Sequence, residues 1–258
     1  MEIIRNLLKI IMWVLIIGFF FNFVMQTVSY SFYKSAKKIT EISYEPCSIK
    51  FNDRLTGYGY NLDRPSDTVI LFFGGSNYIA YNSVASYSGN FDCPFISADY
   101  YGTQDSKGKM NLKTMQQTAV EMYDWTRKEY PDAEIVVMGH SYGAGMAAYL
   151  AGVREIQYLF LAAGYCDISD LYNKIIPVFY GPFRVFISND IRVSEYAENV
   201  LCPVYVIGSD ADTTLDLSVQ EKVAECFENS ELKCFGGIAH EDYFVNDEVI
   251  GYIKEIIG

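Results

Sequence analysis

Residues 135–145 read IVVMGHSYGAG, an apolar, β-branched run that leads directly into glycine, histidine and serine. Gly139, Ser141 and Gly143 form a G-x-S-x-G pentapeptide between an expected strand and an expected helix of small residues. Glycines are needed there because neighbouring chain passes close to a sharp strand-to-helix turn, where a Cβ would clash. We therefore expect Ser141 to project above the edge of a sheet as a nucleophile, with a plain structural turn as the alternative.

The chain around this pentapeptide alternates short β-branched or aromatic runs with amphipathic stretches from about residue 44 onward. Such alternation is typical of an α/β fold, in which a mostly parallel sheet is covered by helices on both faces. The expected strands of this eight-stranded sheet are 46–51, 55–60, 68–73, 94–99, 134–138, 157–162, 203–207 and 231–235.

The clearest helix signal follows Asn111, a good N-cap residue, and continues to about Tyr130 with apolar residues spaced three and four apart. Pro131 is expected to end this helix. Further helices are expected after Ser141, over 215–229 and over 246–257.

A serine hydroxyl becomes a good nucleophile only when a base removes its proton, and the chain contains only two histidines. His240 lies in a glycine-containing loop between an expected strand and the last helix, from which an imidazole could reach back to Ser141. His140 adjoins the serine at a strand end and is expected to point away as a packed or hydrogen-bonded neighbour. We therefore predict His240 as the general base.

An imidazole base needs a carboxylate on its second nitrogen. The strand over 203–207 ends in GSDADTTL, which offers Asp210 and Asp212. Asp212 is favoured because an Asp-x-x-apolar step into the next helix recurs in this kind of loop, and Asp210 stays open as the alternative.

Two backbone amides should stabilise the oxyanion of a tetrahedral intermediate. One belongs to Tyr142, the residue after the nucleophile. The strand over 68–73 leads into Gly74, Gly75 and Ser76, whose backbone can approach a substrate closely. We predict Ser76 N–H as the second donor, with Gly75 as its neighbouring alternative and a plain glycine turn as the structural one.

The chain begins with an uncharged apolar run, IIMWVLIIGFFFNFVMQTV, from Ile10 to Val28. A helix of this length matches a hydrocarbon core of about 30 Å. The following residues offer little for signal cleavage, so we expect an uncleaved single-pass anchor in the cell membrane, with a cleaved signal or a buried helix as alternatives. Basic residues flank both ends, which leaves the side of the catalytic domain open.

The expected organisation is therefore an anchor and linker over 1–43 and one domain over 44–258. Within that domain, residues 164–202 interrupt the alternation with many aromatic and aliphatic residues. We interpret this stretch as a short cap over a binding cleft, with an ordinary packed insertion as the alternative.

Composition excludes several function classes. Half of the residues are hydrophobic and 20% are charged, which is not typical of a disordered chain. Residues 1–40 carry a net charge of +4, so the rest carries −16 within the total of −12, and such a surface repels nucleic acid. The six cysteines show no metal-ligand spacing with the histidines, so we expect no metal site. Most of them lie beside apolar runs and are expected to be buried free thiols, with a pairing of Cys226 and Cys234 left open.

Taken together, the glycine turn at 74–76, the GHSYG pentapeptide, and then Asp212 and His240 resemble the α/β-hydrolase superfamily from about residue 45 onward. Residues 99–102 look like its D-x-x-G turn, and 199–203 resemble its usual approach to the acid-bearing strand. The short cap and N-terminal anchor look like the membrane-anchored branch related to monoacylglycerol lipases and serine aminopeptidase-like hydrolases. Two features depart from the pattern: Gly74-Gly75 replaces the usual His-Gly, and the acid loop is one residue longer.

The resemblance implies a serine hydrolase that needs no cofactor and cleaves a carboxylic ester or thioester through an acyl-enzyme. The aromatic cap and the anchor favour a lipid-like ester as substrate and a membrane as partner, with no role for nucleic acid. An aminopeptidase-like hydrolase and a catalytically silent, membrane-anchored binding module are the alternatives.

Overall fold

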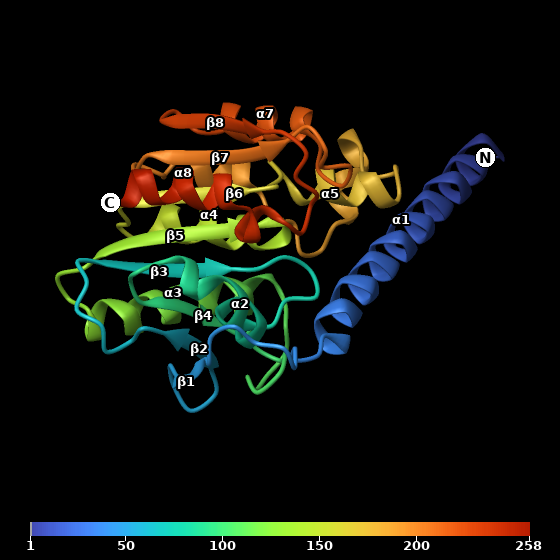
Figure 1. Ribbon diagram of the computed structural model, residues 1–258. Helices are drawn as coiled ribbons and strands as arrows, with labels where there is room; N and C mark the ends of the chain where they lie inside the picture. The colour runs from blue at the N-terminus through green and yellow to red at the C-terminus, as the bar shows by residue number, and fades with distance from the viewer. Residues whose placement is uncertain (1) are drawn as a thin grey trace.

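The computed structural model describes residues 2–258, and its centre is one eight-stranded sheet (Figure 1). The strand order is β1-β2-β4-β3-β5-β6-β7-β8, in which β2 is antiparallel to both of its neighbours, β1 and β4, and all the other pairs are parallel. The strands are β1 Cys47–Lys50, β2 Thr56–Tyr60, β3 Thr68–Phe73, β4 Phe95–Ala98, β5 Glu134–His140, β6 Tyr158–Ala162, β7 Val204–Ser209 and β8 Ser230–Phe235. The predicted mostly parallel, eight-stranded sheet is confirmed.

The central strands are continuous apolar runs because both of their faces are covered. Every residue of β3 from Val69 onward is buried, as are the residues of β5 from Ile135 onward. Helices α2 (Ala80–Tyr87) and α8 (Asp247–Ile257) lie on one face, and α3 (Leu112–Glu129) and α4 (Ala144–Val153) on the other (Figure 1). Helix α7 (Leu217–Glu225) packs on β7 and β8.

Helix α3 begins where its capping signal predicts it. Asn111 caps α3 by accepting a hydrogen bond from the amide of Thr114, and the Thr114 hydroxyl accepts one from the Asn111 amide in return. The predicted helices after Ser141 and at the C-terminus correspond to α4 and α8. Helix α2 was not predicted, because its first residue follows Ile79, which provides no side-chain cap.

Residues 164–202 contain two short helices, α5 (Ile168–Ile175) and α6 (Val193–Ala197), and the 3-10 turn η3 (Gly181–Phe186). Helix α6 packs directly on α4, while α5 and η3 lie towards α1 beyond the sheet edge (Figure 1). Arg184 ties the segment together by ion pairs with Asp167 and Asp190.

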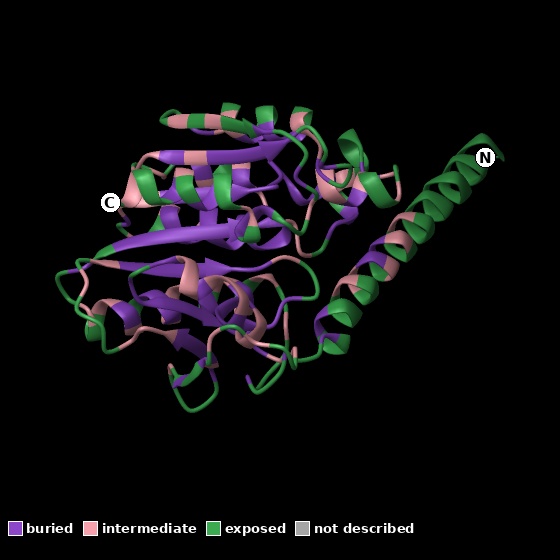
Figure 2. Cartoon of the chain, in the orientation of Figure 1, coloured by how far each residue is buried: buried purple, intermediate pink, exposed green. Residues whose placement is uncertain are grey.

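Helix α1 runs from Glu2 to Ser35 and is the one helix within residues 2–258 that is long and apolar enough to cross a membrane. The expected run over 10–28 is only its middle part. Its N-terminal part is exposed along its length, whereas its C-terminal part carries buried residues (Figure 2). Met25 and Tyr33 are 1% and 0% exposed, which shows that the helix is packed against the domain rather than detached from it.

All six cysteines have free thiols. The pairing of Cys226 with Cys234 that the sequence left open is therefore not formed: the Cys226 thiol donates to the backbone oxygen of Lys222 at 3.3 Å, and Cys234 lies exposed on the edge strand β8.

Candidate active site

Ser141 stands at the sharp turn between β5 and α4, with a φ of 50°. This left-handed conformation is rare for a residue with a side chain and indicates a backbone held in place by its surroundings. Gly143 permits the turn, because a Cβ there would overlap the carbonyl oxygens of Phe73 and Gly74. At Gly139, a Cβ would come within 2.7 Å of the Cα of Ala144. The glycines of the pentapeptide are therefore required sterically, as the sequence indicated.

His240 lies in the loop after β8, and its Nε2 is 2.9 Å from the Oγ of Ser141. Its Nδ1 is 2.8 Å from Oδ2 of Asp212, in the loop after β7. A carboxylate accepts only, so Nδ1 carries the proton that is donated to Asp212 and the neutral Nε2 can accept from the serine hydroxyl. The structure thus brings together three side chains that were predicted from distant parts of the sequence.

Asp212 is held by four donors. Besides His240, the amides of Thr214 and Leu215 donate to Oδ1 at 2.8 and 3.0 Å, and the Tyr243 hydroxyl donates to Oδ2 at 3.2 Å. Burial raises the pKa of Asp212, but hydrogen bonds from His240 and the two amides outweigh it and hold the pKa below its ordinary value. The carboxylate is therefore charged at neutral pH and can stabilise a protonated His240.

Asp210, the alternative acid, faces a different group. Its Oδ1 accepts a hydrogen bond from the amide of Gly237 at 2.8 Å, in the loop that carries the base. Asp210 thus fixes the loop of His240, while Asp212 contacts the imidazole itself.

His140 is a hydrogen-bonded neighbour, as predicted. Its Nε2 is 2.7 Å from the backbone oxygen of His240, and the two rings lie 5.2 Å apart. Burial lowers the pKa of His140 to about 4, and the nearby His240 adds to the effect. The ring is therefore neutral at pH 7, and its N–H donates to the main chain of His240.

The loop between β3 and α2 passes directly over Ser141. A Cβ on Gly75 would lie 3.1 Å from the Cβ of Ser141, so the backbone at Gly75 comes close to the serine. Ser76, the predicted oxyanion donor, lines the same cleft of about 480 Å³ together with Gly75, His140 and Glu241. Tyr142, the other predicted donor, follows Ser141 at the start of the turn into α4.

Sequence reasoning missed two contributors. Tyr243 donates to Asp212, and Tyr33 of α1 packs its ring 6.0 Å from that of Tyr142. Tyr243 lies three residues after His240, a spacing that gave no signal in the sequence, and the position of Tyr33 depends on how α1 folds back onto the domain.

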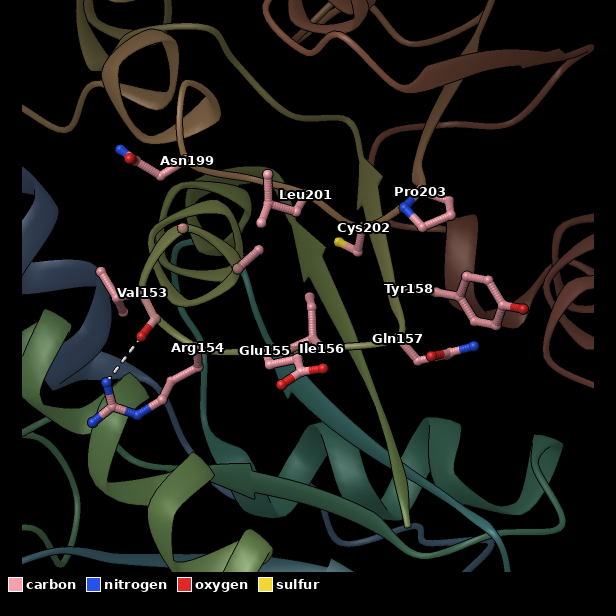
Figure 3. A pocket seen from close by; sticks show the side chains of 12 residues that line it. Val153, Arg154, Glu155, Ile156, Gln157, Tyr158, Asn199, Leu201, Cys202 and Pro203 are labelled. Atoms are coloured by element: carbon pink, nitrogen blue, oxygen red, sulfur yellow. Dashed lines mark hydrogen bonds between the residues drawn. The ribbon is translucent and has the colours of Figure 1, made fainter. Parts of the chain in front are cut away.

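A larger hollow of about 610 Å³ lies at the opposite edge of the sheet (Figure 3). It is formed between the end of α4, the start of β6 and the segment leading into β7. Figure 3 shows Arg154 there, with its guanidinium bonded to the oxygen of Val153 at 2.9 Å. The lining contains neither Ser141, His240 nor Asp212, so this hollow is separate from the cluster.

Comparison with known proteins gives a consistent picture. No family model matches the chain. A lysophosphatidylserine lipase, ABHD12 of Danio rerio, is 26% identical over 146 residues, which are 50% of this chain and 38% of that protein. Protein ABHD12B of Homo sapiens is 25% identical over 152 residues, 52% of this chain and 42% of that protein. The matches thus span less than half the length of these relatives.

Solved structures match over a longer stretch. The Pyrococcus furiosus esterase Pf2001 has a TM-score of 0.66 at 18% identity, covering 87% of this chain and 94% of its own. Est1E of Butyrivibrio proteoclasticus, solved with ferulic acid, has a TM-score of 0.62 at 15% identity, over 82% and 96%. Esterase 2 of Thermogutta terrifontis, phosphoramylated by tabun, has a TM-score of 0.62 at 16% identity, over 84% and 95%. The strand order and these likenesses together show that the chain has the fold of the α/β-hydrolase superfamily.

Proposed function

We propose that this protein is a serine hydrolase that cleaves a carboxylic ester or thioester through an acyl-enzyme, with Ser141 as nucleophile, His240 as base and Asp212 as the orienting acid. The observation that carries the proposal is the hydrogen-bonded series from Ser141 Oγ to His240 Nε2 at 2.9 Å and from His240 Nδ1 to Asp212 Oδ2 at 2.8 Å. These are the distances over which a proton is transferred in nucleophilic catalysis.

In the proposed reaction, Ser141 Oγ attacks the carbonyl carbon while its proton passes to His240 Nε2. The resulting imidazolium is stabilised by Asp212, whose pKa lies below its ordinary value. The oxyanion accepts hydrogen bonds from the amides of Tyr142 and Ser76, with Gly75 as the alternative to Ser76. His240 then protonates the leaving alcohol or thiol, and water attacks the acyl-enzyme with His240 again acting as base.

The proposed substrate is a lipid-like ester or another acyl compound. Three observations favour it: the exposed apolar helix α1, the aromatic cap segment over 164–202, and the sequence similarity to a lysophosphatidylserine lipase. The chain is proposed to be a single-pass protein of the cell membrane, with residues 1–43 as anchor and linker and 44–258 as the hydrolase domain. No nucleic acid, metal or cofactor takes part in the proposal.

An aminopeptidase-like activity is the second candidate. It requires an acidic group near the nucleophile to bind a substrate amine, and Glu241 lines the cleft beside His140 and Gly75. A panel of esters, thioesters and aminoacyl amides would separate the two, since an aminopeptidase loses activity when Glu241 is replaced by Gln, whereas an esterase with an apolar acyl group retains it.

The direct test is labelling with a fluorophosphonate probe, which reacts with an activated serine. We expect the wild-type chain to be labelled, Ser141→Ala to be unlabelled, and Ser218→Ala, at an exposed site on α7, to be labelled like the wild type. Absence of labelling in all three would favour the third reading, a membrane-anchored binding module without catalytic activity.

A further inference from the structure

Helix α1 is bound to the cap segment by polar side chains on its inner face. Asn22 accepts a hydrogen bond from the amide of Ser188 at 3.2 Å and donates to its hydroxyl at 3.1 Å. Gln26 donates to the Tyr172 hydroxyl at 3.3 Å and accepts from the side chain of Asn189 at 2.5 Å. Asn22 and Gln26 lie one helical turn apart, so the helix meets the cap in a defined register. The position of the cap along α1 is therefore fixed.

This register sets how much of α1 is left for a membrane. Between Lys9 and the first docked residue, Asn22, only residues 10–21 are uncharged and free of polar contacts, and at ~1.5 Å per residue they span about 18 Å. A hydrocarbon core is about 30 Å thick, so a crossing helix needs more residues than these. The bilayer must extend either towards residue 3, with Arg5 and Lys9 reaching up to the headgroups, or past Asn22 towards residue 28.

Both solutions place Gly18 inside the hydrocarbon. If the hydrocarbon boundary next to the domain is at Phe21, Gly18 lies three residues, about 5 Å, inside it. If that boundary is at Val28, Gly18 lies ten residues, about 15 Å, inside it. The turn η3 lies at the same level, because the Phe186 ring fills the space in which a Cβ on Gly18 would stand. Phe19 also packs its ring edge-on against Phe186 at 5.3 Å. The cap therefore reaches the depth of Gly18.

The outward side chains of the cap suit that depth. Within residues 2–258, seven large apolar residues outside α1 are exposed, and four of them belong to this short segment: Ile175, Tyr180, Phe183 and Val185. Val185 is 80% exposed, whereas its charged neighbour Arg184 is turned inward onto Asp167 and Asp190. Charges are thus directed to protein partners and apolar groups to the surroundings, as in protein that contacts lipid.

A groove of about 420 Å³ runs between α1 and the cap. Its walls come from Val14, Ile17 and Phe21 on the helix and from Pro177, Phe179 and Phe183 on the cap. Among the residues that the structure describes, no charged side chain lines this groove. An apolar groove that lies beside the exposed face of α1 offers a lipid chain the same surroundings as the bilayer itself.

We propose that residues 175–186 of the cap insert beside α1 into the membrane leaflet next to the domain, and that the groove between these residues and α1 holds one acyl chain of a bilayer lipid. This inference rests on the proposed membrane location of α1. According to this inference, the acyl part of the proposed ester lies on the lipid-facing side of the cap. The cap is then a second contact of the protein with the membrane, besides the anchor.

Insertion is tested with tryptophan fluorescence of the full chain in phosphatidylcholine vesicles whose acyl chains carry bromine, which quenches fluorescence on contact. In a background of Trp13→Phe and Trp125→Phe, Val185→Trp reports on the cap and Leu201→Trp on the amino edge of the sheet. Both sites are highly exposed, so both tryptophans can be accommodated. We expect strong quenching for Val185→Trp, from the ~5–10 Å depth typical of interfacial insertion, and none for Leu201→Trp.

The native Trp13, observed alone in Trp125→Phe, reports on α1. If Trp13 is quenched and Val185→Trp is no more quenched than Leu201→Trp, the cap stays in water and the inference is overturned. If Trp13 itself is not quenched, the proposed membrane location of α1 fails and this inference fails with it. Neither readout needs hydrolytic activity, so a failure of the proposed chemistry remains distinguishable.

The groove is tested by filling it. Ile17→Trp places a large ring in the groove, and Ile16→Trp places the same ring on the neighbouring residue, which does not line it. The readout is the ratio of activity on a long-chain ester in vesicles to that on a short-chain, water-soluble ester. We expect Ile17→Trp to lower this ratio about tenfold, the scale on which apolar pockets discriminate, and Ile16→Trp to leave it unchanged. Equal ratios in both variants would contradict the proposal that the groove holds the acyl chain.

Discussion

The two ends of the parallel strands, called here the carboxyl edge and the amino edge of the sheet, differ in the side chains that lie there. At the carboxyl edge, the loops after β5, β7 and β8 bring Ser141, Asp212 and His240 within hydrogen-bonding distance. At the amino edge lies the larger hollow, lined by Arg154, Glu155 and other residues without a nucleophile and base in contact. The volume of a hollow therefore does not identify the site. Strand direction does, because parallel strands deliver all their following loops to one edge.

Removing the nucleophile should abolish hydrolysis at the carboxyl edge of the sheet. We expect Ser141→Ala to lower kcat for the preferred ester by about 10⁴ to 10⁶ fold, since the base then has no hydroxyl to activate. The matched change at the amino edge is Cys202→Ala. Burial raises the pKa of Cys202 to about 11, so its thiol stays protonated and is a poor nucleophile. Steady-state hydrolysis should be unaffected there, and a large loss in Cys202→Ala would reverse the comparison of the two edges.

The second prediction separates two acids on one loop. Asp212→Asn should lower kcat by about 10⁴ fold, because an amide favours the wrong tautomer of His240 and cannot stabilise the imidazolium. Asp210→Asn keeps an oxygen that can accept from the Gly237 amide, so its loss should stay within about tenfold. The measurement is kcat and KM for both variants on one substrate. Comparable losses would mean that catalysis depends on the position of the loop that carries His240 rather than on the carboxylate that contacts its imidazole.

The third prediction concerns the buried histidine at this edge. The pKa of His140 is lowered to about 4, whereas an unfolded histidine titrates near 6.5. The neutral ring therefore contributes stability that is present above pH ~6.5 and is lost as the pH falls towards 4, by roughly 3 kcal/mol in total. Denaturant unfolding of the detergent-solubilised chain at pH 7 and pH 4 should show a smaller loss in His140→Gln. An unchanged loss would indicate that the folded protein already protonates His140.

Local sequence signals predicted most of the sheet and the triad-like cluster. Apolar runs bounded by turn residues were enough to place all eight strands, with boundaries within two residues of those observed. Ser141 and His240 could be assigned because the strand-turn-helix context and the small number of histidines left few choices. Both signals are contained in short stretches of chain, and the sheet topology then brings those stretches together.

Contacts between distant segments could not be predicted. The docking of α1 depends on Asn22 and Gln26 meeting the segment 164–202, whose position follows from the whole fold, and a periodicity signal contains no such information. The sequence could not decide between Ser76 and Gly75 as oxyanion donor for the same reason, because a difference of one residue in a loop depends on packing. In the structure the backbone at Gly75 lies close to Ser141, and both Gly75 and Ser76 line the cleft.

Tyr243 gives the smallest expected effect and the sharpest test of how the carboxyl edge is held together. Its hydroxyl is one of four donors to Asp212 and the longest of them, at 3.2 Å. Tyr243→Phe keeps the ring in its buried site and removes only this hydrogen bond, worth about 1 kcal/mol, so kcat should fall about fivefold with KM unchanged. A fall in kcat together with a weaker response to Asp212→Asn in the double variant would show that the two side chains act as one unit. Additive effects would mean that the amides of Thr214 and Leu215 orient the carboxylate without help from Tyr243.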